Sequence, residues 1–166
     1  DDDSAATASG WMSVMLVVIP HLPPTMVTLL FRTIRPLLSV QESLSLQKRA
    51  YLVLEAMLQQ HSEILHESET RLSILSVMSD SLLLSHVSAR HMRLRCIEVL
   101  LKEMNEDEVN QACSTVLGEV LICQKDANKK TRDSAVAVLR LLTKRIPPSQ
   151  LLPQLCSGVV GETSLM

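Results

Sequence analysis

Residues 124–142 read "QKDANKKTRDSAVAVLRLL", a polar turn followed by a stripe of apolar residues. Ala135, Leu139 and Leu142 recur at spacings of four and three, which place them on one face of an α-helix. We therefore predict a helix over residues 128–146. Whether this helix belongs to a repeating structure depends on whether the pattern occurs elsewhere in the chain.

The start of this helix is basic. Lys129, Lys130 and Arg132 lie at the end of the helix where its dipole disfavours positive charge. Asn128 is a good N-cap residue, and Asp126 is the alternative for that position. Two interpretations stay open, a structural helix start and a phosphate-binding element.

The pattern occurs twice more, in "LQKRAYLVLEAML" (46–58) and "MRLRCIEVLLKEM" (92–104). Each stretch has a small residue followed by Leu four positions later, and the small residues are Ala50, Cys96 and Ala135. These positions are separated by 46 and 39 residues. A period near forty with two helices per unit is typical of HEAT and armadillo-type repeats, which stack to bury faces that one helix pair cannot bury alone.

The composition favours helices throughout. Aromatic residues make up only 2% of the chain, there are four glycines, and Leu, Val, Met and Ala carry much of the apolar content. We predict an all-α, HEAT/armadillo-type solenoid of antiparallel helix pairs, with a bend at Pro36. The predicted helices cover residues 10–19, 25–39, 44–65, 68–85, 88–104, 107–124, 128–146 and 149–160.

We expect one repeat domain. Residues 1–9 are predicted to be a flexible lead-in, residues 10–160 to form three to four helix pairs, and residues 161–166 to be a tail or a break. Neither terminal repeat is polar enough to act as a cap and the sequence does not begin with Met, so we expect a segment of a longer array. The longest apolar run, residues 11–19, is too short to span a bilayer, and no membrane partner is expected.

Basic residues recur near the starts of the three related helices although the net charge is −2. In a stack of repeats, equivalent positions form a ridge that would attract phosphates. The alternative is that these residues pair with acidic neighbours such as Glu98, Asp126 and Asp133. The candidate contacts to RNA phosphates or to an acidic partner are Lys48, Arg49, Arg90, Arg93, Arg95, Lys125, Lys129, Lys130 and Arg132.

Catalytic chemistry is not predicted. The chain has no nucleophile elbow, no glycine-rich phosphate loop and no zinc-binding helix motif, so we expect no enzyme activity, no cofactor and no small-molecule substrate. The acidic run at 105–109 lies at a helix start, where the dipole favours acid. Trp11 and Tyr51 are interpreted as packing residues rather than as platforms on which nucleic-acid bases stack.

The histidines and cysteines also indicate structural positions. His61 and His66, like His86 and His91, are five residues apart, a spacing that does not bring two side chains together on one helix face, so no metal site is expected. No two cysteines form a C-x-x-C pair, and each lies among apolar neighbours. We expect buried free thiols at Cys96, Cys113, Cys123 and Cys156.

Three stretches together resemble a known family. These are "PHLPPTMVTLLFRTIRPLLS" with the "LQKRAYLVLEAML" that follows it, then "ARHMRLRCIEVLL", and then "GEVLICQKDANKKTRDSAVAVLRLL". They are similar, in this order over residues 11–145, to the eukaryotic HEAT-repeat family of ribosomal-RNA-processing proteins that is twelfth in the yeast naming series. The third stretch is the most specific of them. The chain departs from the family at Val136, where many members have an aromatic residue, and in its short loops between repeats.

This resemblance implies a non-enzymatic, karyopherin-like scaffold of the nucleolus and nucleus that also shuttles to the cytoplasm. It implies association with pre-ribosomal particles, including the small-subunit processome, and support of pre-rRNA processing and subunit export. The implied partners are proteins of the pre-ribosomal particle, pre-rRNA and nuclear transport factors.

Two other binding functions compete with this interpretation. An importin-type transport receptor or another HEAT adaptor would hold basic protein partners on an acidic face, whereas the recurring charge in this sequence is basic. A tubulin-binding array would need basic and aromatic residues in its loops, and apart from "KDANKK" the loops have few of either.

Overall fold

The structure is a computed structural model that describes residues 2–41, 43–81 and 85–163, and its regular elements over these ranges are all helical. The all-α class predicted from the sequence is therefore confirmed. The α-helices are α1 (Asp2–Val18), α2 (Pro24–Ile34), α3 (Leu44–Gln60), α4 (Ser68–Asp80), α5 (Arg90–Glu103), α6 (Glu106–Gln124), α7 (Lys129–Arg145) and α8 (Pro148–Thr163). Short 3-10 helices are η1 (Ile19–His21), η2 (Arg35–Ser39), η3 (Ser62–Leu65) and η5 (Val87–Ala89).

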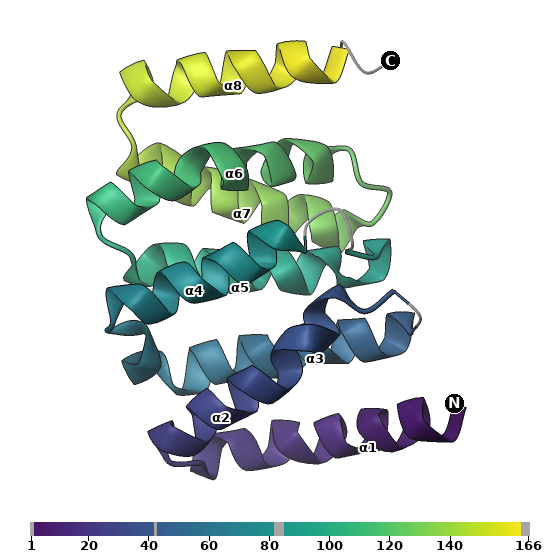
Figure 1. The fold of residues 1–166 in the computed structure, drawn as a ribbon. Coiled ribbons are helices and arrows are strands. Elements are labelled where there is room, and N and C mark those ends of the chain that lie inside the picture. The colour runs from purple at the N-terminus through teal and green to yellow at the C-terminus, as the bar shows by residue number, and fades with distance from the viewer. Residues whose placement is uncertain (1, 42, 82–84, 164–166) are drawn as a thin grey trace.

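The helices form two layers (Figure 1). One layer contains α1, α3, α5 and α7, and each of these helices packs against the next one in that order. The other contains α2, α4, α6 and α8, and successive helices of the chain run in opposite directions. The structure thus stacks antiparallel helix pairs, as predicted, while the assignment to the HEAT or armadillo class stays a prediction.

Most predicted helix starts lie close to the observed ones, but the helices predicted over 44–65 and 68–85 end earlier, at Gln60 and Asp80. Residues 82–84 of the second prediction lie outside the described residues. Two further differences lie at the ends of the chain. Helix α1 begins at Asp2, so the predicted flexible lead-in is wrong for residues 2–9, whose alanine-rich sequence favours a helix. Helix α8 continues to Thr163, so residues 161–163 are not a tail, and residues 164–166 lie outside the described part. Near Pro36, where a bend was expected, α2 gives way to the 3-10 helix η2.

The register inferred from the sequence agrees with the side-chain contacts. Three residues hold equivalent positions, three places before the repeated small residue, and each donates to backbone carbonyls that precede its own helix. Gln47 donates to Val40 O at 3.2 Å, Arg93 donates to Met78 O, and Arg132 donates to Asp126 O at 2.7 Å. The three helices are therefore fixed to their incoming chain in the same way.

Other polar contacts join neighbouring repeats. The guanidinium of Arg95 on α5 pairs with Glu55 on α3 at 2.7 Å. At the opposite end of this layer, Arg145 on α7 donates to the carbonyl oxygens of Leu101 at 3.1 Å and Met104 at 2.7 Å, which close α5. These contacts set the position of each helix along its neighbour.

The second layer has a buried ion pair of its own. Arg71 on α4 contacts both carboxylate oxygens of Glu108 on α6, at 2.7 and 2.8 Å. Glu108 also completes a capping box with Asn105 at the start of α6. The hydrogen bonds from Arg71 are the main reason that the pKa of Glu108 falls to about 2.

Arg93 is buried more deeply than Arg71, and its guanidinium bonds to four different residues. Only 1% of its surface is exposed, and it pairs with Glu119 on α6. It also donates to the hydroxyl oxygens of Tyr51 at 2.7 Å and Ser81 at 2.9 Å, and to the carbonyl oxygen of Met78. One guanidinium therefore connects helices α3, α4, α5 and α6.

Breaking this network should unfold the stack far more readily than breaking a surface contact. We expect Arg93→Met to lower the free energy of unfolding by about 3 kcal/mol or more, because Glu119 would be left charged and buried without its partner. The double variant Arg93→Met/Glu119→Leu should recover part of this loss. Urea unfolding measures both values, and Arg140→Met on the exposed face of α7 is the matched control. A double variant no more stable than Arg93→Met would show that Glu119 is not the group responsible.

Candidate phosphate-binding edge

The nine predicted contact residues differ in how far their side chains are exposed to solvent. One of them is buried, Arg93. Three are half-buried, namely Arg49, Arg90 and Arg132. Five are exposed, namely Lys48, Arg95, Lys125, Lys129 and Lys130.

The prediction that Arg93 contacts RNA or an acidic partner is wrong. Its guanidinium points into the core, and its hydrogen bonds go to Glu119, Tyr51, Ser81 and Met78. A charged side chain is this deeply buried only when such partners are present, and here they are supplied by three other helices or their ends.

The half-buried arginines serve the structure. Arg90 pairs with Asp126 at 3.0 Å, which confirms the acidic neighbour expected for the basic turn. Arg132 donates to the carbonyl oxygen of Ala127 at 2.8 Å as well as to that of Asp126. Arg49 reaches back to the preceding repeat, where it donates to Ser9 O at 3.4 Å and to the hydroxyl of Ser13 on α1.

Asn128 and Asp126 were the two residues predicted for the N-cap position of α7. Asn128 is the N-cap, and its side-chain oxygen accepts from the Lys130 backbone N–H at 2.9 Å. Asp126 has a different role, because its carboxylate accepts from the Asn128 N–H at 2.8 Å as well as pairing with Arg90. The predicted pairing partner Glu98 instead contacts Lys102 within α5, at 2.7 Å.

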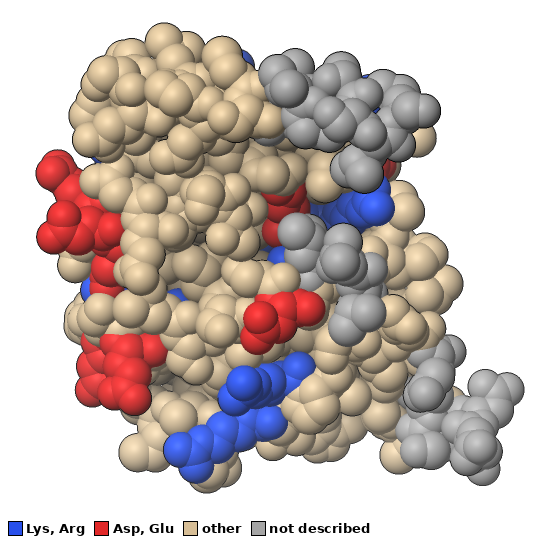
Figure 2. Space-filling view, turned by 45° about the horizontal axis from the view of Figure 1, so that its top comes forward, with Lys and Arg blue, Asp and Glu red and all other residues tan. Residues whose placement is uncertain are grey.

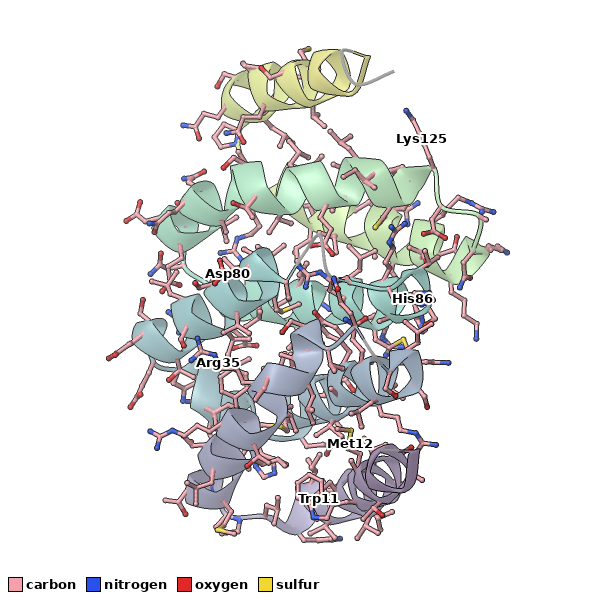
Figure 3. The ribbon with its side chains drawn as sticks, turned by 45° about the vertical axis from the view of Figure 1, so that its right-hand side comes forward. Trp11, Met12, Arg35, Asp80, His86 and Lys125 are labelled. Atoms are coloured by element: carbon pink, nitrogen blue, oxygen red, sulfur yellow. The ribbon has the colours of Figure 1, made fainter. Side chains whose placement is uncertain are left out.

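Four of the exposed basic residues lie on the first two turns of three neighbouring helices. We call this set the basic edge, and it consists of Lys48 on α3, Arg95 on α5, and Lys129 and Lys130 on α7. Figure 3 turns this side of the molecule forward and shows nitrogen-tipped side chains where these helices begin. Lys125 lies apart from the set, on the loop that follows α6 (Figure 3).

His91 lies within the basic edge and responds to its charge. The pKa of its imidazole is lowered, first by burial and then by the positive charges of Lys130, Lys48 and Arg95. Three successive helices therefore place cations around one point. The charge of Arg95 is itself paired with Glu55, at a distance of 2.7 Å.

Exposed acid gathers at the opposite ends of α3 and α5, in the turns that lead into α4 and α6, and we call this the acidic edge. The last turn of α7 is instead basic. Figure 2 shows acidic side chains gathered where α4 and α6 begin, on the left of the view. An acidic surface was not predicted from the sequence, although acid recurs in the two turns that follow α3 and α5, and the run at 105–109 was interpreted only as a helix start. The exposed residues of the acidic edge are Glu63, Glu67, Glu69, Glu103, Glu106 and Asp107.

Other candidate chemistry is weak in the described part of the chain. No group of three or more His, Cys, Asp or Glu residues there could hold a metal ion. Cys96, Cys113 and Cys123 are buried as expected, and burial raises the pKa of Cys123 to about 11, which makes it a poor nucleophile. The expectation is wrong for Cys156, which is exposed on α8.

The two aromatic side chains interpreted as packing residues differ in their positions. Tyr51 is fully buried, as expected. Trp11 remains 42% exposed on α1, which lies at the end of its layer and packs there against α3. Trp11 therefore packs against the fold with only part of its side chain.

Among residues 2–41, 43–81 and 85–163, no helix is both long and apolar enough to cross a membrane. Comparison of the chain with protein families, with curated proteins and with solved structures gives no match.

The charge around His91 can be tested by titration. We expect Lys130→Gln to raise the pKa of His91, because removing a nearby cation makes protonation of the imidazole less unfavourable. Lys48→Gln should act in the same direction. NMR titration of the His91 ring measures the shift, and Lys102→Gln at the far end of α5 is the control that should leave it unchanged. Equal pKa values in all the variants would contradict the arrangement of the basic edge.

Proposed function

We propose that this chain is a non-enzymatic scaffold of ribosome biogenesis that binds pre-ribosomal particles and contacts pre-rRNA through the basic edge. In this role it supports pre-rRNA processing and subunit export, acts at the small-subunit processome, and is located in the nucleolus and nucleus with shuttling to the cytoplasm. The protein partners, the transport factors and the location follow from the resemblance of the three sequence stretches. The observation that carries the RNA contact is the placement of exposed cations on the first turns of three helices that pack side by side.

The basic edge has the chemistry that phosphate binding needs. Lysine ammonium groups act as flexible point charges, and each phosphate that they neutralise releases counterions, which makes binding favourable and sensitive to salt. The free N–H groups in the first turn of α7 add to the positive potential at the same place. The structural arginines beside them hold the helix starts in position.

Charge reversal on α7 tests this proposal. We expect Lys129→Glu/Lys130→Glu to reduce RNA binding and to make the remaining binding less dependent on salt, because fewer phosphates are neutralised. Lys144→Glu, on the last turn of the same helix, is the control for a change of charge away from the basic edge. An unchanged salt dependence in the α7 double variant would argue against the RNA contact.

The biological assignment needs a separate measurement. Affinity purification of the tagged protein at two salt concentrations should recover pre-rRNA and small-subunit assembly factors, with the RNA lost at the higher salt. Recovery of transport cargo or tubulin without ribosomal precursors would contradict the assignment to ribosome biogenesis.

The acidic edge favours a second candidate function. An importin-type receptor or another HEAT adaptor would use exposed carboxylates to hold basic protein segments, and the acidic edge offers six of them in two successive turns. Substitution of Glu106 and Asp107 by glutamine and asparagine would weaken recovery of such partners and leave RNA recovery unchanged. Substitution of the basic-edge lysines should instead weaken recovery of RNA and leave recovery of these protein partners unchanged.

A further inference from the structure

We propose that the basic edge binds double-stranded RNA, through its phosphates, in preference to single-stranded RNA. This inference rests on the proposed RNA contact and specifies which form of RNA is bound. It follows from the rigidity of the surface, from the positions of the chain's aromatic residues and from the chemistry of the exposed side chains.

The charges of the basic edge are held on a rigid frame. Lys48, Arg95 and Lys130 are carried by three helices that pack side by side, not by a loop. Neighbouring helix axes lie about 8–10 Å apart, so the set spans about 20 Å. Arg95 is fixed further by Glu55, and the start of α7 is fixed by the Asn128 cap and by Arg132.

Aromatic stacking is not available at this surface. The chain has three aromatic residues. Tyr51 is fully buried under the Arg93 guanidinium, and Phe31 is half-buried on α2, in the other layer. Trp11 is exposed, but it lies about 200° around α1 from both Ser9 and Ser13, which face Arg49 of α3. The indole therefore points away from the basic edge.

These features lower the affinity for a single strand more than for a duplex. A single strand must lose conformational freedom when it lies along a rigid surface, and proteins that bind single strands offset this cost with aromatic stacking worth about 1–3 kcal/mol per base. A duplex presents its phosphates at fixed positions and has little freedom to lose. Double-stranded RNA is recognised largely through its shape, its phosphates and its 2′-hydroxyls, and charges on a rigid frame suit that mode.

The experiment compares two RNAs that carry similar numbers of phosphates. One is a blunt duplex of about 12 base pairs, and the other is an oligouridylate of about 24 nucleotides, which does not fold on itself. Fluorescence anisotropy over a range of salt concentrations measures both affinities. We expect the duplex to bind at least about tenfold more tightly, the difference that loss of a single stacked base would produce.

Variants locate the preference on the molecule. Lys48→Gln/Lys130→Gln should lower the salt slope for the duplex by about 1 per lysine and reduce the preference for the duplex. Lys102→Gln/Lys144→Gln, at the opposite ends of α5 and α7, should leave both unchanged. Circular dichroism and thermal unfolding establish that the variants are folded.

Each outcome has a distinct meaning. Tighter binding of the single strand, or equal affinities, would overturn the duplex preference while the RNA contact stands. Failure of both RNAs to bind would overturn the proposed RNA contact itself. A preference for the duplex that the Lys48 and Lys130 substitutions do not alter would show that the duplex binds elsewhere on the chain.

Discussion

The buried guanidinium of Arg93 is the constraint on which the rest of the structure depends. A guanidinium has five N–H donors and stays charged, so its removal from water requires acceptors arranged around its plane. Those acceptors are the carboxylate of Glu119, the hydroxyls of Tyr51 and Ser81, and the carbonyl oxygen of Met78. Since they come from α3, α6 and the end of α4, the relative positions of these helices and α5 are set by one side chain.

The basic residues at the helix starts fall into two groups, one facing inward and one facing outward. On α5, Arg93 faces the core and Arg95, two positions later, faces outward, because two residues differ by about 200° around a helix. On α7, Arg132 bonds to the incoming loop, while Lys129 and Lys130 are exposed. The inward group fixes each helix to its loop, and the outward group is left at the surface. The basic edge is therefore made of the outward-facing group.

Sequence reasoning predicted the repeat register well because the register depends on local spacing. The small residues and the leucines that follow them mark one face of each helix, and Ala50, Cys96 and Ala135 are all fully buried. Arg93 was misplaced although it lies three residues before Cys96, on that same face. Its burial depends on Glu119, which is 26 residues away on another helix, and no local pattern reports such a partner.

The burial of residues at the end of the stack was also predicted less well, because it too depends on contacts with other helices. The apolar run of α1 resembles a buried helix, yet Val17 is 73% exposed and Val14 is 56% exposed. Periodicity shows which side chains share a face, whereas burial depends on whether another element covers that face. The interior helices α3 and α5 have neighbours on both sides within their layer, so the predictions made for them agree more closely with the structure.

The separation of charge explains why the net charge of −2 says little about binding. Helix α3 contains 17 residues, so its two ends lie about 25 Å apart. At physiological ionic strength, interactions between exposed charges are screened over about 8 Å. The basic and acidic edges therefore act independently. A polyanion at one edge is attracted by the nearby lysines and is repelled little by the carboxylates at the other, so a chain that is acidic overall still presents a local surface suited to phosphate.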